Sequence, residues 1–367
     1  AAAFQSGVDA EPTFAGRLAQ IRRSHSRFMF EIAASELFGK LSMGDAKTHQ
    51  TALAEASVAA AVSIVKEELS RRIERPIDDF PFAVLGLGKL GGNAMDYGSD
   101  LDLVLVYDDE SPLTYVEPES LTPAVVFAKA VELFVTTLSA MTREGSLYRV
   151  DLRLRPDGKN GAPATGVNSF LGYFESRASV WEWLAYVKLR AVGGDRDLAR
   201  RAADRAREII HRRASKADPE ELRAETLRVR EMLESQKARR NRRSIDIKYG
   251  EGGLLDVYFA MRFLQLRDNV PDEGADRSTL HMLGTLHAGG CLTPRDFQAL
   301  AAGYAFLSEL DHYLRLTIGR ATKLPPAREV LNRIAKMMKL RTASELRERL
   351  ALHRMEIRSS FESVLKS

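Results

Sequence analysis

The sequence predicts an α+β protein in which a small mixed sheet lies between a helical arm and a helical domain. Apolar side chains recur at a spacing of three and four over residues 13–70, which is typical of helices. The period then changes to two in FAVLGLG (82–88) and DLDLVLVYD (100–108), which indicates two strands joined by a glycine-rich turn. From Asp195 onward the helical period returns. We therefore expect three domains: an arm over 1–74, a sheet domain over 75–195 and a helical domain over 196–367.

Further elements of the sheet domain follow from the same reasoning. Residues 123–142 form an amphipathic pattern and predict a helix, and SLYRVDLRLRP (146–156) predicts a third strand that ends at its proline. GKNGAPATG (158–166) is typical of a loop. The stretch 169–194 predicts a helix that ends at paired glycines. Two breaks interrupt the helical domain, at 245–253 and 319–326.

The charge balance argues against a nucleic-acid-binding protein. The chain has 54 basic and 50 acidic residues in 367, a net charge of +4, so any anion site must be local. The basic run RRNRR at 239–243 has no aromatic platform beside it, which favours a solvated helix end; a surface for an acidic partner is the alternative. We expect no nucleic-acid partner.

The sequence gives indirect indications of the cellular compartment. No apolar run reaches the ~18 residues of a membrane span, and the N-terminus has no basic-then-apolar secretion signal. Cys291 is the single cysteine, which fits a reducing compartment. We therefore predict a cytoplasmic protein with no membrane partner. The first residue is alanine and not methionine, which suggests a processed chain or a piece of a longer one.

Three aspartates form the candidate catalytic and metal site. Asp100 and Asp102 are two residues apart in a predicted strand, so both project from one face while Leu101, Leu103 and Leu105 project from the other. Asp151 alternates with apolar neighbours and reaches the same face if the third strand pairs beside the second. Close carboxylates repel each other unless a cation lies between them, and Mg²⁺ is a suitable one. An exposed edge with solvated charges is the alternative.

The glycine-rich turn before these aspartates suits a polyphosphate. Glycines leave backbone N–H groups unobstructed, and a lysine and a hydroxyl can add contacts; the candidates are Gly88, Lys89, Gly91, Gly92 and Ser99. The turn also fits the G-x-G-x-x-G pattern of dinucleotide-binding folds. That alternative expects an acidic residue ~20 positions on, after a helix. Here a carboxylate pair comes too early and with no helix between.

Four further cations are candidate nucleotide-binding residues. Arg153 and Arg155 share a strand face with Asp151, where they would bind phosphates or pair with the aspartates themselves. Lys188, placed with Arg190 in a predicted helix, has the same two interpretations. Lys248 lies in the glycine-rich break at 245–253, which would close over a nucleotide or merely cap the adjacent helices.

Taken together, these motifs resemble a known superfamily and, within it, one family. A glycine-lysine turn, a Gly-Ser-Asp-Leu-Asp strand and a later strand aspartate match the nucleotidyltransferase superfamily that includes polymerase beta. Four segments appear in the order found in glutamine synthetase adenylyltransferase: LGLGKLGGNAMDYGSDLDLVLVYD, LYRVDLRLRPDGKNGAPATGVNSFLGYF, WEWLAYVKLRAVGGD and IDIKYGEGGLLDVYFAMRFLQLR. The resemblance covers residues 84–267.

The resemblance implies a fold, a reaction and partners. It implies a polymerase-beta-like sheet domain, ATP as substrate, and two Mg²⁺ ions on Asp100, Asp102 and Asp151. Proteins of the family have two homologous halves: one attaches AMP to a tyrosine of glutamine synthetase, and the other removes it by phosphorolysis to give ADP. The expected partners are glutamine synthetase, PII signal proteins and the other half. Tyr-Gly-Ser-Asp-Leu-Asp-Leu favours the attaching half, whereas Trp-Glu-Trp-Leu-Ala-Tyr-Val-Lys is nearer to the removing half.

One departure from the family pattern keeps a second function class open. The family usually has Asp-Ile-Glu-Phe where this sequence has Asp256-Val257-Tyr258-Phe259, so a tyrosine replaces the usual glutamate. The alternative is a catalytically silent module that binds nucleotide or a regulator. A transferase that uridylylates PII is a third possibility, against which the helical tail and the 245–256 motif argue.

Overall fold

The computed structural model describes residues 7, 11–74, 76, 77, 79–110, 122–237, 245–274 and 276–366. The fold is mixed α and β, as expected, and it divides into two compact units. The sheet unit comprises Ala1–Ala178 and Lys188–Ile209, and the helical unit comprises Ser179–Val187 and Ile210–Ser367. The basic run at 239–243 lies outside the described residues. The helical arm and the sheet fall within one unit, and the division into three domains stays a prediction.

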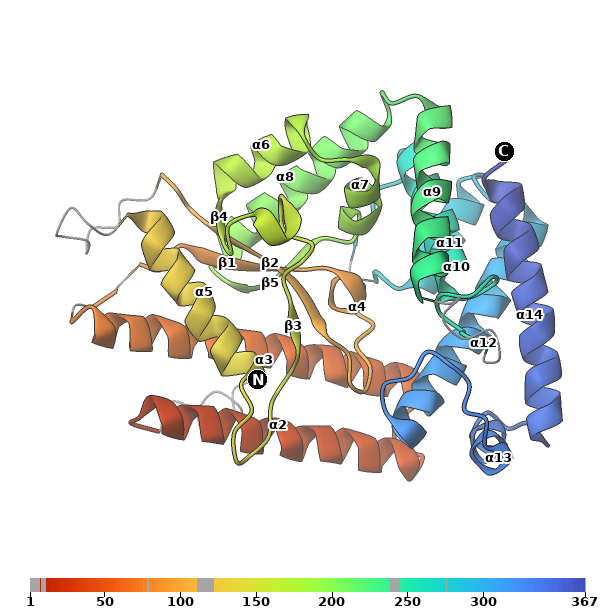
Figure 1. The fold of residues 1–367 in the computed structure, drawn as a ribbon, viewed down its shortest axis with the longest axis horizontal. Coiled ribbons are helices and arrows are strands. Elements are labelled where there is room, and N and C mark those ends of the chain that lie inside the picture. The colour runs from red at the N-terminus through yellow and green to blue at the C-terminus, as the bar shows by residue number, and fades with distance from the viewer. Residues whose placement is uncertain are drawn as a thin grey trace. The chain divides into compact units, whose positions relative to one another are not determined.

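Two long helices begin the sheet unit and confirm that residues 13–70 are helical for the most part. α2 (Phe14–Leu37) starts where the Thr13 hydroxyl accepts a hydrogen bond from the amide of Gly16 at 3.0 Å. α3 (Met43–Arg72) starts with a capping box, in which the hydroxyl of Ser42 accepts from the amide of Asp45 at 3.1 Å. The two helices lie side by side (Figure 1).

The sheet has the mixed character that the sequence predicts, with the order β3-β2-β1-β5. β1 (Phe82–Gly86) pairs antiparallel with β2 (Leu101–Tyr107) on one side and with β5 (Arg190–Gly194) on the other. The far edge of β2 is shared by β3 (Val150–Asp151) and β4 (Thr165–Gly166), both parallel to it. The expected third strand therefore does pair beside the second.

The third strand is much shorter than expected. Pairing stops at Asp151, because the guanidinium of Arg155 binds the carbonyl oxygens of Leu152, Lys159 and Gly161 at 2.9, 3.1 and 3.0 Å and curls the chain into a turn. A single 3₁₀ turn, η1 (Gly158–Asn160), follows. The predicted loop at 158–166 also ends in β4 and is not entirely loop.

The helix expected over 169–194 is wrong in its second half. The structure has α6 (Val167–Ser176), α7 (Val180–Tyr186) in the helical unit, and then β5, which carries Arg190. Lys188 precedes this strand and is not helical. Gly193 explains the choice of strand, because a Cβ there would lie 2.6 Å from Cγ1 of Val58 on α3. Gly193 lets β5 pack closely against that helix, and Gly194 lets it approach the backbone of Phe82 in β1, 2.1 Å from where a Cβ would lie.

The core of the sheet unit lies on the apolar face of β2. Leu101, Leu103 and Leu105 are buried together with Val84 of β1 and with Phe134 of α5 (Pro123–Ser139). Asp102 alternates with these leucines, so it projects from the opposite face. The alternation in the sequence thus places the carboxylates outside this core, as predicted.

The helical unit confirms the helical period of the second half of the chain. α8 (Arg196–Ala214) spans the division between the units. The other helices are α9 (Pro219–Lys237), α10 (Leu254–Arg267), α11 (Thr279–Ala288), α12 (Pro294–Ile318), α13 (Arg328–Met337) and α14 (Ala343–Val364). The two predicted breaks come together, because the amide of Ile247 donates to the carbonyl of Thr322 at 2.8 Å.

None of the helices within the described ranges combines the length and the apolar character that crossing a membrane would require.

Candidate active site

Two of the candidate aspartates lie directly beside each other in the sheet. In the parallel pairing of β2 and β3, Asp102 is the register partner of Asp151 and Leu101 is the partner of Val150. The amide of Leu101 donates to the carbonyl of Arg149 at 2.9 Å, which fixes this register. Asp100 is the residue immediately before β2. Two aspartates of adjacent strands and the aspartate that precedes β2 therefore lie at one end of the sheet.

Arg153 is bound by the carboxylate of Asp151. Its Nε lies 2.9 Å from both carboxylate oxygens, its Nη2 makes a further close contact, and its amide donates to Oδ1 at 2.9 Å. The hydrogen bond and charge of Asp151 raise the pKa of Arg153, and the charges of Asp102 and Asp100 add to that shift. The ion pair expected as one interpretation of Arg153 is thus present, and all three aspartates act on this guanidinium.

The glycine-rich turn forms a short helix, α4 (Gly88–Gly91), packed tightly against two of the candidate residues. Gly88 has φ +56°, and a Cβ on it would lie 2.1 Å from Oδ2 of Asp102. A Cβ on Gly91 would lie 2.6 Å from the carbonyl oxygen of Lys188, and one on Gly92 would lie 3.1 Å from Nζ of the same lysine. The close approach of Asp102 to Gly88 and of the Lys188 carbonyl to Gly91 requires glycine at these two positions.

Lys89 and Ser99 both contact Asp96, which the sequence analysis did not single out. Nζ of Lys89 lies 3.9 Å from Oδ2 of Asp96, and the hydroxyl of Ser99 accepts a hydrogen bond from the amide of Asp96 at 3.2 Å. The side chain of Asp96 is fully buried and Ser99 is buried as well. Asp96 therefore contacts the lysine of the turn through its carboxylate and the residue that precedes Asp100 through its backbone amide.

Two of the candidate arginines hold backbone groups of the site. Arg155 binds three carbonyl oxygens of the turn after β3, as described above. Arg190 on β5 donates through Nε and Nη2 to the carbonyl of Leu90 at 3.0 and 2.9 Å, and it pairs with Glu55 at 2.5 Å. Both guanidinium groups therefore shape the loops around the aspartates.

Lys248 belongs to the helical unit. Its amide donates to Oδ1 of Asp246 at 2.9 Å, and its ammonium lies 5.2 Å from the ring centre of Tyr249. Asp246 also accepts a hydrogen bond from the hydroxyl of Thr322 at 2.9 Å, so it ties the 245–253 break to the later one. The local role of this segment is to join two turns of the helical unit.

Tyr258, the residue that departs from the family pattern, packs within the helical unit. Its ring lies 6.0 Å from that of Tyr304 at an angle of 63°, and the guanidinium of Arg262 lies 5.7 Å from its centre. Burial and the neighbouring Tyr304 and Asp311 raise the pKa of its hydroxyl well above the usual value. The phenol therefore stays neutral.

A polar stripe on α3, which was not predicted from the sequence, contacts the loop between α4 and β2. Lys47, Thr51 and Glu55 are four residues apart and so lie on one face of the helix. Nζ of Lys47 lies 3.7 Å from Oδ2 of Asp96, and the hydroxyl of Thr51 accepts from the amide of Met95 at 3.2 Å. Glu55 pairs with Arg190. The only signal in the sequence was this spacing within an alanine-rich helix.

The donor chemistry of the three aspartates fits a hard divalent cation. Carboxylate oxygens are the ligands that Mg²⁺ prefers, and the guanidinium of Arg153 shows that the site attracts positive charge. In the part of the chain that the structure describes, no three His, Cys, Asp or Glu side chains form a cluster ready to hold a metal ion. Because the guanidinium of Arg153 already binds both oxygens of the Asp151 carboxylate, a metal ion at Asp151 would compete with it.

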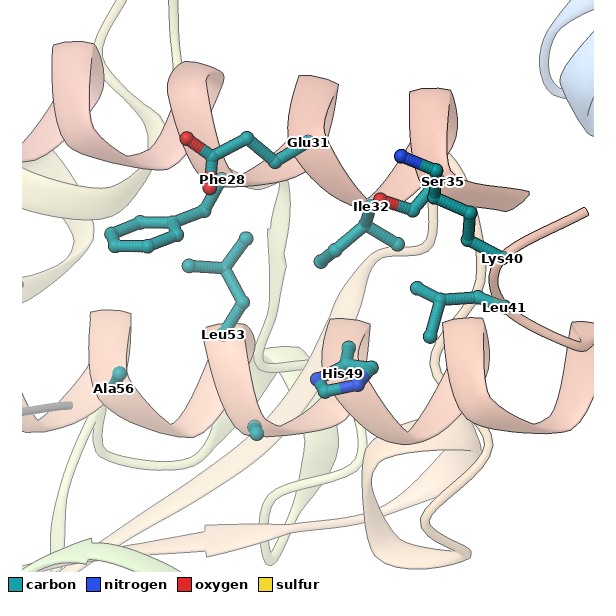
Figure 2. A pocket seen from close by; sticks show the side chains of 10 residues that line it. Phe28, Glu31, Ile32, Ser35, Lys40, Leu41, His49, Leu53 and Ala56 are labelled. Carbon is teal, nitrogen blue, oxygen red and sulfur yellow. The ribbon is translucent and has the colours of Figure 1, made fainter. Parts of the chain in front are cut away.

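A separate pocket of about 470 Å³ lies between α2 and α3 and contains none of the candidate site residues. Figure 2 shows the side chains that line it, with Phe28 and Ile32 of α2 facing Leu53 of α3, and His49 on the α3 side. Its lining is mainly apolar. The pocket belongs to the helical arm and not to the carboxylate site.

Comparison with known families gives matches over both parts of the chain. The model of the glutamate-ammonia ligase adenylyltransferase family matches residues 1–205, more than half of the chain. The model of the GlnD PII-uridylyltransferase family matches residues 227–365. The helical tail was expected to distinguish this chain from a uridylyltransferase; that expectation is wrong, because residues 227–365 are similar to the uridylyltransferase family.

Three curated relatives have the same printed name, bifunctional glutamine synthetase adenylyltransferase/adenylyl-removing enzyme. The protein from Idiomarina loihiensis is 34% identical over 67% of this chain and 26% of its own length. The protein from Rhizobium meliloti is 32% identical over 82% of this chain and 30% of its own. The protein from Pseudomonas aeruginosa is 29% identical over 94% of this chain and 35% of its own. The chain thus spans about a quarter to a third of the length of these relatives.

Proposed function

Because the chain belongs to the glutamate-ammonia ligase adenylyltransferase family, we propose that its sheet unit transfers AMP from ATP to a tyrosine of glutamine synthetase. The sheet is proposed to be that of the polymerase-beta superfamily. One observation carries the proposal: Asp102 and Asp151 are register partners on parallel strands, and Asp100 is the residue immediately before β2. A site that did no chemistry would have no need of three mutually repelling carboxylates at one end of a sheet.

We assign metal binding to the three aspartates. Asp100, Asp102 and Asp151 would hold two Mg²⁺ ions, which when bound neutralise the triphosphate and lower the pKa of the attacking tyrosine hydroxyl. The register of β2 and β3 keeps the carboxylates of Asp102 and Asp151 on neighbouring strands. Arg153 balances these carboxylates in the structure and would turn to the phosphates when a nucleotide binds.

The loop around α4 is assigned to the phosphates. Lys89 and Lys188 would supply positive charge, and Ser99 would supply a hydroxyl. Gly88, Gly91 and Gly92 keep the backbone close to Asp102 and Lys188, where side chains would collide. Arg155 would act through the turn that it holds after β3. Lys248 stays a proposed nucleotide contact from the helical unit.

In the proposed reaction the tyrosine oxygen attacks the α-phosphorus of ATP in line with the leaving group. The new O–P bond forms as the bond from the α-phosphorus to the bridging oxygen breaks, and pyrophosphate leaves. The tyrosine proton goes to solvent, so this chain need not supply a separate general base. The lysines of the loop would stabilise the charge that gathers on pyrophosphate.

The removing reaction is the second candidate, and the printed name of the relatives includes both activities. In that direction inorganic phosphate would attack an AMP-tyrosine at the same site and release ADP. The motif Tyr97-Gly98-Ser99-Asp100 supports the attaching direction, and Trp181 to Lys188 is nearer to the removing half. The non-enzymatic alternative is a catalytically silent module that binds nucleotide. It is favoured by Tyr258, which replaces the glutamate usual in the family.

The proposed partners are glutamine synthetase as substrate and a PII signal protein as regulator. The names of the relatives support the first, and the match of residues 227–365 to a PII-uridylyltransferase family supports the second. The other half of a bifunctional protein is a further proposed partner.

Two incubations test the proposal. The first contains this chain, Mg²⁺, α-labelled ATP and unmodified glutamine synthetase. The second contains AMP-modified synthetase and inorganic phosphate. Each is run beside the double variant Asp100→Asn, Asp102→Asn, and beside Asp204→Asn as a matched control, because Asp204 is an exposed carboxylate on α8.

Transfer of label to the synthetase that the double variant loses and Asp204→Asn retains would support the attaching activity. Release of ADP only in the second incubation would support the removing activity. If neither label transfer nor ADP release is detected although the synthetase is folded and active, the catalytic proposal fails and the nucleotide-binding module is the better interpretation.

A further inference from the structure

Asp100 lies just outside the strand pairing that fixes the other two candidate aspartates. The pairing of β2 with β3 begins at Leu101 and continues to Asp102, whose register partner is Asp151. Asp100 immediately precedes β2, so the position of its backbone depends on the turn that leads into the strand. The contacts that hold this turn therefore help to place Asp100.

The turn consists of Asp96, Tyr97, Gly98 and Ser99. The amide of Ser99 donates to the carbonyl oxygen of Asp96 at 3.0 Å, and the amide of Asp96 donates to the hydroxyl of Ser99 at 3.2 Å. Gly98 has φ +63°, which glycine adopts without strain at the third position of a turn. These two hydrogen bonds close the turn, but they do not determine its orientation within the sheet unit.

The helical arm orients the turn through contacts to three successive residues. Two of these contacts come from α3. The hydroxyl of Thr51 accepts a hydrogen bond from the amide of Met95 at 3.2 Å, and Nζ of Lys47 lies 3.7 Å from Oδ2 of Asp96. The third contact comes from α2 and involves Tyr97, so both helices of the arm hold the turn.

Tyr97 is bound to α2 through its hydroxyl, which donates to Oε2 of Glu36 at 2.8 Å. Burial, together with the hydrogen bond and the charge of Glu36, raises the pKa of Tyr97 well above its usual value. The phenol therefore keeps its proton near neutral pH and donates it to a carboxylate, which makes a stronger hydrogen bond than one between neutral groups. Phenylalanine at this position would fill nearly the same space without the bond.

We propose that Tyr97 is a positioning residue of the metal site, and that its hydrogen bond to Glu36 sets where the carboxylate of Asp100 lies. The inference rests on the proposed function, because that function assigns Asp100 to metal binding. Tyr97 acts here through the turn and not by touching metal or substrate. Groups that orient the ligands of a metal ion change its affinity, whereas a bond that only joined the arm to the loop would contribute to stability alone.

The test measures metal binding to the whole chain and needs no assay of activity. Electron paramagnetic resonance of free Mn²⁺, used in place of Mg²⁺, gives the affinities of the wild type and of Tyr97→Phe, Glu36→Ala, Glu36→Gln and Asp100→Asn. Tyr107→Phe is the matched control, because it removes a hydroxyl from the far end of β2, where Tyr107 is the register partner of Phe82. Urea denaturation of the same preparations shows that each variant is folded.

We expect Tyr97→Phe and Glu36→Ala each to weaken Mn²⁺ binding about three- to tenfold, the effect of one lost hydrogen bond, and Tyr107→Phe to leave it unchanged. Glu36→Gln should keep most of the affinity, since its amide oxygen can still accept from the phenol. Because this variant also loses the charge of Glu36, it separates positioning from an effect of charge on the metal. The double variant Tyr97→Phe, Glu36→Ala should bind Mn²⁺ about as well as either single variant, because both changes remove the same bond.

The outcomes separate this inference from the proposed function. If Asp100→Asn weakens Mn²⁺ binding but Tyr97→Phe binds as tightly as Tyr107→Phe, the bond is only a structural link, and the inference is overturned while the metal site stands. Equal losses in Glu36→Gln and Glu36→Ala also overturn it, because the effect is then one of charge. If Asp100→Asn binds Mn²⁺ as tightly as the wild type, the metal assignment of the proposed function fails, and this inference fails with it.

Discussion

Gly88 lies directly against the carboxylate of Asp102. Its φ of +56° and the 2.1 Å that would separate a Cβ from Oδ2 leave no room for any side chain. We expect Gly88→Ala to displace Asp102 and to lose Mg²⁺-dependent nucleotide turnover by at least tenfold. The strained backbone should also lower the free energy of unfolding by about 1 kcal/mol or more. Activity and urea denaturation are measured on the same preparations.

Gly172→Ala is the matched control for that change. Gly172 is an exposed residue within α6, and a Cβ on it would meet nothing within 4 Å. Alanine in a helix interior should raise stability by about 0.5–1 kcal/mol and leave turnover unchanged. Equal turnover in Gly88→Ala and Gly172→Ala would show that the contact with Asp102 has no part in the chemistry.

The guanidinium of Arg153 pairs with the carboxylate of Asp151, which a metal ion would also bind. Replacing Arg153 should therefore strengthen metal binding. We expect Arg153→Gln, without nucleotide, to bind Mn²⁺ about three- to tenfold more tightly than the wild type, since a competing cation is lost. Electron paramagnetic resonance of free Mn²⁺ measures this without any assay of activity. The control is Arg143→Gln, which removes an exposed arginine from the loop before β3. An unchanged Mn²⁺ affinity in Arg153→Gln would contradict competition at Asp151.

The pattern of β2 could be predicted because it is local. Alternation fixes which side chains share a face, so the separation of Asp102 from Leu101 and Leu103 follows from the sequence alone, and the structure agrees. The ends of β3 could not be predicted in this way. Residues 152–155 continue the alternation, but Arg155 binds carbonyl oxygens up to Gly161 and turns the chain away. A side chain that binds backbone groups several residues ahead does not change the apolar–polar alternation of the sequence, so the alternation cannot predict the turn.

Long-range contacts decided the other misses. Residues 190–194 follow a helical stretch in the sequence, but they pair with β1 and lie close to Val58 at Gly193, and so they form β5. The link between Lys47 and Asp96 joins positions almost fifty residues apart. No periodicity within either segment indicates such a partner. The assignment of the nucleotide-binding residues stays a prediction for the same reason, since it depends on how such segments meet a ligand.

The helical unit contains a buried ion pair whose disruption should cost stability. Asp256 on α10 pairs with Arg230 on α9, both side chains being at most 1% exposed, and its Oδ2 accepts from the amide of Gly252 at 2.7 Å. Asp256→Asn would remove the closer of two carboxylates that balance Arg230, the other being Glu234 at 3.1 Å from its Nη1, at a cost of about 1–3 kcal/mol. The pair variant Arg230→Met, Asp256→Leu should lose less than the single change. Urea denaturation followed by circular dichroism measures both, and equal losses would contradict a coupled pair.

His25 should give the sheet unit an acid-sensitive stability. Burial beside Tyr148, whose ring lies 4.9 Å away, lowers the pKa of His25 to about 4. The unfolded chain binds the proton near pH 6.5, whereas the folded chain does not until about pH 4, so stability is present above pH 6.5 and declines as the pH falls toward 4. The wild type should lose about 2 kcal/mol from this residue between pH 7 and pH 5. His25→Phe keeps a ring against Tyr148 and removes the titration, so its free energy of unfolding should decline less over that range. Urea denaturation measures the free energy of unfolding of both proteins at each pH. If this free energy falls by the same amount in the wild type and in His25→Phe between pH 7 and pH 5, His25 does not titrate in this way.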